Sequence, residues 1–316
     1  MSRRYFLSTV GLTLAGASLA RCSFVSNETI PEPQPPVADV EKLMARGIGA
    51  FRHTWTHVQG LKIHSLVSSA SVSLDAPVIV LVHGSGLSGR YMIPTAHQLA
   101  TDCRVYVPDL PGFGDSDKPA KVFDVPELAD CLVAWMLAIE LDRVALLGNS
   151  FGCQVIADLA ARYPERVEAA LLQGPTTPPE ERSWFWQFIR WRQNQPYNPR
   201  SLGPITYEDY KKCGLRRMYG SFQSQLTDRI EDKATRIQAP VLVVRGANDP
   251  IANQRWCEEI AGLCPRGKLV LIPEVAHTLC YTAPVQLAAV SRSFLKEIGA
   301  GAKAVRYSGI MMGKIK

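Results

Sequence analysis

The stretch VALLGNSFGCQVIADLA, residues 144–160, decides the fold. It begins with an apolar run typical of a buried strand, passes through Gly-Asn-Ser-Phe-Gly at 148–152, and ends with apolar positions at helical spacing. Such a pattern between a strand and a helix predicts a sharp turn that exposes Ser150 as a nucleophile. The alternative is a small residue in an ordinary loop. Which of the two holds depends on whether suitable partners for Ser150 follow in the chain.

Strand and helix patterns alternate on both sides of this stretch. Continuous apolar, β-branched runs predict buried strands, helical periodicity predicts the segments between them, and residues 51–69 predict a hairpin. The strand patterns lie in 76–86, 103–119, 143–150, 168–175, 239–250 and 268–277, and the helix patterns in 90–100, 125–141, 153–167, 255–263 and 284–298. The alternation predicts an α/β fold with a doubly wound, mostly parallel sheet, whose strand ends on one edge carry the functional site.

This alternation is interrupted once. From about residue 176 to 233 the chain is rich in aromatic residues and helix formers. An insertion between two halves of a sheet, at its functional edge, predicts a helical cap. We therefore expect a first core half at 46–175, the cap at 176–233, and a second core half at 234–300.

The N-terminus has a different character. Residues 1–22 combine paired Arg3 and Arg4 with a short apolar run, which resembles a bacterial Tat signal peptide, although a frayed terminus is the alternative. This predicts passage through the Tat translocase and a periplasmic or membrane-anchored protein, and Cys22 leaves lipid anchoring of the N-terminus open. A Pro-rich linker is predicted at 23–45 and a basic tail at 301–316.

Composition excludes several classes of function. The chain has 316 residues, of which 47% are hydrophobic and 20% charged, with a net charge of +6 and no basic stripe, so nucleic-acid binding is not expected. No His or Cys cluster has the spacing of metal ligands, so no metal is expected. Among the eight cysteines, only Cys257 and Cys264 lie close enough in sequence to suggest a disulfide.

Two residues can complete the chemistry that Ser150 needs. A serine hydroxyl becomes nucleophilic when a general base takes its proton and an acid orients that base. His277 is the only histidine after Ser150, and it follows the last strand pattern, whereas Asp249 follows the preceding one. The loop after Gln173 offers no carboxylate. The sequence therefore predicts Ser150, Asp249 and His277 as catalytic residues at one edge of the sheet.

The tetrahedral intermediate of such a reaction also needs hydrogen-bond donors. The backbone amides of Phe151 and of Ser85, in the loop HGSG at 83–86, are predicted to form the oxyanion hole. Gly84 and Gly86 allow close approach of the backbone, and we expect them to contact substrate. His83 is expected to brace this loop.

Aromatic residues of the cap are the candidates for the rest of the substrate site. Trp184, Trp186 and Trp191 are predicted to line an apolar pocket, although packing of the cap onto the core is an equally good explanation for each. Four arginines of the cap either meet a substrate carboxylate or lie on a solvated face, and the latter is favoured. They are Arg190, Arg192, Arg216 and Arg217.

Five motifs in residues 51–298 together resemble the α/β-hydrolase superfamily. They are HGSG, PDLPGFGDSDKP, GNSFG, RGANDP and PEVAH. The serine at 150 distinguishes the chain from haloalkane dehalogenases and epoxide hydrolases, which use a carboxylate nucleophile. HGSG and GNSFG also resemble the meta-cleavage product hydrolases. That subgroup tends to continue its oxyanion loop with Pro-Gly, where this chain has Leu87-Ser88, and to follow its histidine with Trp, where this chain has Thr278.

The resemblance implies a serine hydrolase that acts without a cofactor. We expect it to cleave a small to medium apolar carboxylic ester or lactone through an acyl-enzyme on Ser150. The alternatives are a C–C bond hydrolase of the meta-cleavage type and a non-catalytic protein that binds an apolar ligand under the cap.

Overall fold

The computed structural model describes residues 23–24, 51–69 and 72–301. The predicted signal peptide, most of the predicted linker and all but the first residue of the predicted tail lie outside the described residues. Within the part that is described, no helix is both long and apolar enough to span a membrane.

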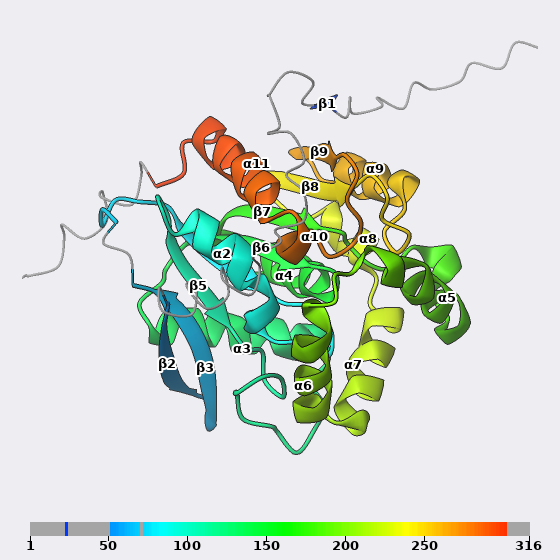
Figure 1. Cartoon of the computed structure of the whole chain (residues 1–316). Coiled ribbons are helices and arrows are strands. Elements are labelled where there is room, and N and C mark those ends of the chain that lie inside the picture. The colour runs from blue at the N-terminus through cyan, green and yellow to red at the C-terminus, as the bar shows by residue number, and fades with distance from the viewer. Residues whose placement is uncertain (1–22, 25–50, 70–71, 302–316) are drawn as a thin grey trace, which may run out of the picture.

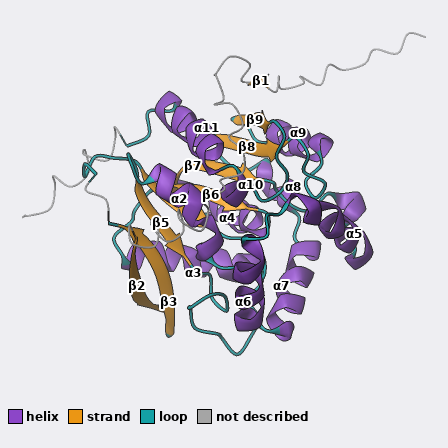
Figure 2. Ribbon diagram, in the orientation of Figure 1, coloured by secondary structure: helices purple, strands orange, loops and turns teal. Residues whose placement is uncertain are grey.

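A sheet of nine strands forms the centre of the molecule, and helices cover both of its faces (Figures 1 and 2). The strand order is β1-β9-β8-β7-β6-β4-β5-β3-β2. The strands are β1 (Ser23–Phe24), β2 (Phe51–Val58), β3 (Leu61–Ser68), β4 (Val78–Val82), β5 (Arg104–Pro108), β6 (Val144–Asn149), β7 (Val167–Gln173), β8 (Val241–Gly246) and β9 (Gly267–Ile272). This arrangement confirms the predicted doubly wound, mostly parallel α/β fold.

The parallel part of the sheet runs from β1 to β5, and the predicted hairpin forms an antiparallel edge. β2 and β3 are joined at Gln59 and Gly60, both with positive φ, and β3 pairs antiparallel with β5. β6 and β8 are buried along their whole length, as their continuous apolar runs predict. At the other edge, Ser23 and Phe24 form β1 parallel to β9, so the first residues of the predicted linker belong to the sheet.

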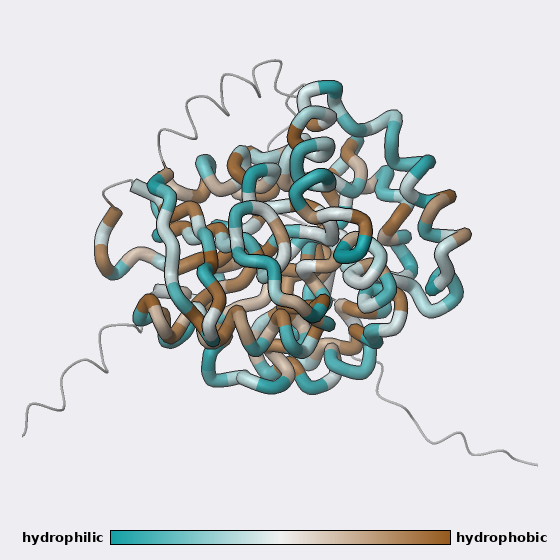
Figure 3. Tube along the Cα trace, turned by 90° about the horizontal axis from the view of Figure 1, so that it is seen from below, coloured by the Kyte–Doolittle hydropathy of each residue, from teal (hydrophilic) through white to brown (hydrophobic). Residues whose placement is uncertain are grey.

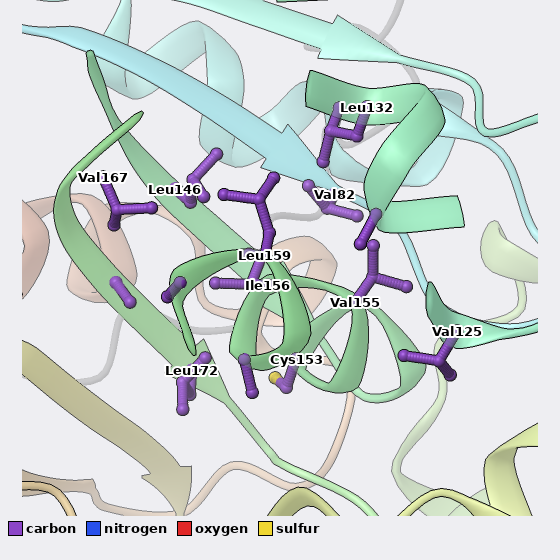
Figure 4. Close-up of a cluster of buried hydrophobic side chains, with 14 of the residues drawn as sticks. Val82, Val125, Leu132, Leu146, Cys153, Val155, Ile156, Leu159, Val167 and Leu172 are labelled. Carbon is purple, nitrogen blue, oxygen red and sulfur yellow. The ribbon is translucent and has the colours of Figure 1, made fainter. Parts of the chain in front are cut away.

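The helices pack on the sheet in two layers. Residues of α3, α4, α8 and α9 form one apolar cluster with the sheet, and residues of α2, α10 and α11 form the other. Figure 4 shows the first cluster, in which Ile156 and Leu159 of α4 lie near Leu146 of β6. These helices are α2 (Ile93–Leu99), α3 (Val125–Ala138), α4 (Phe151–Arg162), α8 (Ile230–Ala234), α9 (Gln254–Leu263), α10 (Leu279–Thr282) and α11 (Pro284–Glu297).

Local signals fix where these helices begin. α3 starts at a capping box, in which the Asp124 side chain accepts from the Glu127 amide and the Glu127 side chain accepts from the Asp124 amide. The pattern at 90–100, expected as one helix, is a 3₁₀ turn at Gly89–Met92 followed by α2. Pro94 lies in the first turn of α2, where its missing amide hydrogen costs no helical hydrogen bond.

Three longer helices are inserted between β7 and β8. They are α5 (Trp184–Asn194), α6 (Leu202–Cys213) and α7 (Leu215–Thr227), and the short helix α8 leads back to the sheet. Figure 1 shows α6 and α7 side by side below the sheet and α5 projecting at the right of the molecule. This helical region lies where the sequence predicts a cap. In the hydropathy view of Figure 3, the protein interior is hydrophobic, whereas the exposed loops are mainly hydrophilic.

The described cysteines are all free. These seven side chains are buried, and Cys257 and Cys264 form no disulfide. Burial raises the pKa of the Cys264 thiol to about 12, so this side chain is an uncharged core residue.

The sheet reverses its winding direction at β4. The chain continues from β4 to β5 on one side and then returns to place β6 on the other side of β4. Ligands of open α/β sheets bind outside the carboxyl ends of the strands at such a point. The loops that follow β4 and β6 carry Ser85 and Ser150, so the topology brings these two residues to one edge.

Candidate active site

Ser150 occupies a strained turn between β6 and α4. Its backbone has φ 57° and ψ −119°, a conformation that costs a non-glycine residue about 1–3 kcal/mol. Its neighbours Gly148 and Gly152 allow the turn to form. A Cβ on Gly152 would lie 2.3 Å from the Val82 carbonyl oxygen, and one on Gly148 would lie 2.7 Å from the Gly152 carbonyl carbon. The Gly-x-Ser-x-Gly spacing therefore reflects the close crossing of α4 over the sheet.

His277 and Asp249 meet at the same edge, as the sequence predicts. His277 Nδ1 lies 2.8 Å from Asp249 Oδ2. The other oxygen of Asp249 accepts from the amides of Ile251 at 2.8 Å and Ala252 at 3.0 Å. Because a carboxylate only accepts hydrogen bonds, His277 carries its proton on Nδ1, which leaves Nε2 free to act as a base. Both side chains are buried.

A glycine at the end of β7 makes room for this pair. A Cβ on Gly174 would lie 3.0 Å from His277 Nδ1 and 3.2 Å from Asp249 Oδ2. Gly174 also has a φ of 61°, which glycine adopts readily. The His277–Asp249 pair therefore fills the space at this end of β7, where the sequence has no carboxylate.

The predicted oxyanion loop is braced from below by His83. Its Nδ1 donates to the Gly84 carbonyl at 2.9 Å, and its Nε2 accepts from the Leu110 amide at 3.0 Å. Burial lowers the pKa of His83, so the ring remains neutral and keeps one donor and one acceptor. This geometry agrees with a bracing role. The Ser85 hydroxyl contacts the Ser221 hydroxyl of α7 at 2.9 Å and thus joins this loop to the inserted helices.

A buried polar network, which no sequence motif indicates, links the three loops. The Gly84 amide donates to the Tyr91 hydroxyl at 2.9 Å, and that hydroxyl donates to Asn149 Oδ1. Asn149 Nδ2 donates to Gln173 Oε1 at 2.7 Å and to the His277 carbonyl at 3.3 Å. Gln173 Nε2 donates to the same carbonyl at 2.8 Å. The loop of Gly84, the residue before Ser150 and the loop of His277 are therefore held in a common frame.

Ser150 and His277 line a cavity of about 560 Å³ between the sheet edge and the inserted helices. Gly84, Ser85 and Gly86 also line it, as predicted. Among the described residues, the lining contains neither Lys nor Arg, and its apolar members come mainly from α5, α6 and α7. These are Trp184, Trp191, Leu202, Tyr210, Leu215, Met218, Tyr219 and Phe222.

One aromatic residue that was predicted to line the pocket lies elsewhere. Trp186 is absent from the cavity wall, has an exposed fraction of 43%, and packs against Phe185. The reason is helical periodicity. Trp184 and Trp191 are seven residues apart and share one face of α5, whereas Trp186 lies on another.

The four arginines considered in the sequence analysis do not line the cavity. Arg190 is paired with Glu181, and Arg217 Nη2 donates to the Pro119 carbonyl at 2.6 Å. Neither Arg192 nor Arg216 is part of the lining. The four therefore provide no partner for a substrate carboxylate. Arg192 and Arg216 are exposed, as the favoured expectation of a solvated face predicts, whereas Arg190 and Arg217 are only partly exposed.

Asp209 of α6 forms a second link between the inserted helices and the oxyanion loop. Its Oδ2 accepts from the Ser88 amide at 3.0 Å and the Ser88 hydroxyl at 2.8 Å, whereas its Oδ1 has no hydrogen-bond partner. Arg90 lies 3.9 Å from that oxygen. Burial raises the pKa of Asp209 to about 6, because the charged form is poorly compensated here.

One group of potential metal ligands lies beside this region. Ligand atoms of His64, Asp109 and Asp115 lie within 4.8 Å of one another. Asp109 already accepts from His64 Nδ1 at 2.8 Å and from the Gly89 amide at 2.7 Å. Burial alone would raise the pKa of Asp109, but the hydrogen bonds from His64 and from the Asp115 amide help to outweigh burial, and the pKa is lowered. These contacts make Asp109 a support for the loop after β4.

Comparison with known proteins agrees with this geometry. Residues 79–290 match the model of the Alpha/beta hydrolase family. A 2-hydroxymuconate semialdehyde hydrolase from Pseudomonas sp. (strain CF600) is 25% identical over 253 residues, which cover 71% of this chain and 88% of that protein.

Solved structures agree at the level of the fold. A membrane phospholipase A described as a bacterial virulence factor superposes with a TM-score of 0.67 at 23% identity, over 84% of this chain and 92% of that one. A carboxylesterase from Bacillus subtilis superposes with a TM-score of 0.63 at 19% identity, over 81% and 97% of the two chains.

Proposed function

This chain belongs to the alpha/beta hydrolase family, and from that premise we propose that it is a serine hydrolase that cleaves a carboxylic ester or lactone of modest size. The observation that carries the proposal is the hydrogen bond of 2.8 Å between His277 and the buried Asp249, beside a cavity that Ser150 also lines. A hydrogen-bonded base, its orienting acid and a nucleophile on a strained turn are the parts that acyl transfer requires.

Each group has a defined step in this reaction. His277 Nε2 takes the proton of the Ser150 hydroxyl as Oγ attacks the carbonyl carbon, and the carbonyl oxygen becomes an oxyanion. The amides of Ser85 and Phe151 stabilise that oxyanion, helped by the positive end of α4. The alcohol then leaves with the proton from His277. Water, activated by the same base, releases the acid from Ser150.

The cavity supports a neutral, apolar substrate. Its walls are mainly aromatic and aliphatic, and its described lining includes no Lys or Arg. A carboxylate placed there would lose its hydration without gaining a cationic partner, which is strongly unfavourable. Polar side chains of the inserted segment, including Gln187, Asn194 and Asn198, can still bind an uncharged ester or lactone group.

A second candidate is the C–C bond hydrolase, favoured by the similarity to the 2-hydroxymuconate semialdehyde hydrolase. A muconate semialdehyde carries a carboxylate, for which the cavity described above has no partner. Leu87-Ser88 and Thr278 also depart from the pattern of that subgroup. We therefore favour the ester or lactone.

Hydrolysis of a chain-length series of p-nitrophenyl esters tests this proposal, with the unmodified chain and its Ser150→Ala variant side by side. We expect activity that disappears with Ser150 and an optimum chain length set by the cavity. Activity that persists in the variant refutes the assignment of the nucleophile. If a vinylogous 1,5-diketone is turned over and no ester is hydrolysed, the C–C bond hydrolase replaces the ester hydrolase as the proposed function. If no substrate is turned over and a fluorophosphonate does not label Ser150, the ligand-binding alternative is favoured.

We also propose export through the Tat translocase. This proposal depends on Arg3 and Arg4 and the apolar run after them, which lie outside the described residues. The buried free thiols of the described residues are what a protein that folds in a reducing compartment before export would have. Replacing both arginines with lysine should retain the protein in the cytoplasm, and unchanged export would refute the proposal.

A further inference from the structure

Helix α5 presents its aromatic residues to solvent and its polar residues to the protein. Its buried residues are Gln187 and Asn194. Five large aromatic side chains of the same helix are 42–65% exposed. We call these residues the α5 aromatic patch, and they are Trp184, Phe185, Trp186, Phe188 and Trp191. A helix that packs against its own protein normally shows the reverse pattern, so this surface suits an apolar environment outside the molecule.

The patch is continuous with the mouth of the cavity. Trp184 stacks on Tyr219 of α7, with ring centroids 5.0 Å apart, and Tyr219 is itself 62% exposed. Leu215, at the start of α7, is 85% exposed. These three side chains and Trp191 also line the cavity. An apolar molecule could therefore pass from the patch to Ser150 without crossing a charged surface.

The charge of this segment indicates the kind of surface that it meets. Residues 184–200 contain three arginines and no acidic residue. Arg190 is paired with Glu181, whereas Arg192 and Arg200 are exposed and form no ion pair within the described residues. Exposed Trp and Phe beside unpaired arginines are the composition of helices that lie in the interface of anionic lipid layers.

We propose that α5 docks on an anionic lipid surface, with the α5 aromatic patch inserted among the headgroups and Arg192 and Arg200 against lipid phosphates. Figure 1 shows α5 projecting at the outside of the molecule. The cavity mouth then faces the lipid, and the substrate class is an apolar ester that partitions into that surface. This last point rests on the proposed function, whereas the docking itself does not.

Vesicle binding by the full chain tests the proposal, with Ser150→Ala as the common background so that no lipid is hydrolysed. Vesicles of phosphatidylcholine alone are compared with vesicles that also contain phosphatidylglycerol. Three of the six tryptophans lie in α5, so quenching of tryptophan fluorescence by brominated lipid reports its insertion directly. The test variant is Phe185→Ser with Phe188→Ser. The matched control is Leu74→Ser, which changes a residue that is 83% exposed in the loop between β3 and β4.

We expect the background protein and the Leu74→Ser control to bind anionic vesicles equally, and the double Phe variant to bind at least roughly tenfold more weakly. Replacing Arg192 and Arg200 with Gln should abolish the preference for anionic lipid. Equal quenching in the double Phe variant overturns the proposal, as does absence of binding. A dimer in sedimentation velocity that the double Phe variant dissociates, without vesicle binding, assigns the patch to a second copy instead.

The outcomes separate docking from catalysis. If the unmodified chain hydrolyses no ester but the vesicle results hold, the proposed function fails and the docking surface remains. If esters are hydrolysed but vesicles are not bound, only the docking proposal fails.

Discussion

Replacement of Tyr91 with Phe tests whether the buried network positions the reacting groups. The Tyr91 hydroxyl is fully buried, accepts from the Gly84 amide at 2.9 Å and donates to Asn149 Oδ1. Phe keeps the ring but leaves both partners unpaired away from water. Each unsatisfied buried group costs about 1–3 kcal/mol, so we expect the loss of both hydrogen bonds to destabilise the variant by about 2–6 kcal/mol. For a domain of this size, this lowers Tm by roughly 4–24 °C.

The same substitution should slow the chemistry more than it weakens binding. Gly84 precedes Ser85, whose amide is the proposed oxyanion donor, and complete loss of one such donor costs roughly 10²–10³ in kcat. Displacement of the loop is milder than loss of the donor, so we expect kcat to fall roughly 10- to 100-fold with little change in KM. Steady-state kinetics on the best p-nitrophenyl ester, below the Tm of the variant, separates the two parameters.

A matched control removes a hydroxyl that has no place in the network. Tyr106 lies on β5, and its hydroxyl accepts a hydrogen bond from Arg104 Nη2 at 3.3 Å. Tyr106→Phe should leave kcat within about twofold and Tm nearly unchanged. If Tyr91→Phe retains the kcat of the unmodified protein, or if both variants lose the same activity, the reasoning about the network is wrong.

Three more substitutions test individual parts of the site. Asp249→Asn should keep the fold by circular dichroism but lower kcat by roughly 10⁴, because the amide no longer holds His277 in its Nδ1-protonated form; near-normal turnover would remove Asp249 from the mechanism. Gly174→Ala places a methyl group 3.0 Å from the His277 ring and should lower kcat at least tenfold. Gly203→Ala, whose methyl group would have no atom within 4 Å, should leave kcat unchanged. Equal kinetics for the two variants would contradict the packing argument. Burial raises the pKa of Asp209 from 3.8 to about 6, so the folded state binds this proton more tightly than the unfolded state. Tm should therefore fall as pH rises from about 4 to about 6. Asp209→Asn should flatten this dependence of Tm on pH, and an unchanged dependence would mean that another group titrates.

The predictable part of this protein is encoded locally. Continuous apolar runs identified the strands from β4 to β9, and glycines around Ser150 identified the turn that follows β6. Because the carboxyl ends of parallel strands share one edge, residues directly after them must converge. This is why Asp249 and His277 could be placed together from sequence, although they are 28 residues apart.

The remaining features depend on contacts that leave no local pattern. The bond between Ser88 and Asp209 joins residues 121 positions apart, and Tyr91 reaches Asn149 across 58 positions. Tyr91 sits in an apolar segment and looks like an ordinary core residue until its hydroxyl is placed. Trp186 was misplaced for a related reason, because the aromatic residues of α5 are too closely spaced to reveal which face the cavity uses.

Fluorophosphonate labelling followed by peptide mass spectrometry tests the central claim most directly. The reagent forms a stable adduct only with a serine that an adjacent base activates. The account predicts one adduct, on Ser150, that is absent in Ser150→Ala and formed far more slowly in His277→Ala. An adduct on another serine, or an unmodified Ser150 in the folded chain, would contradict it.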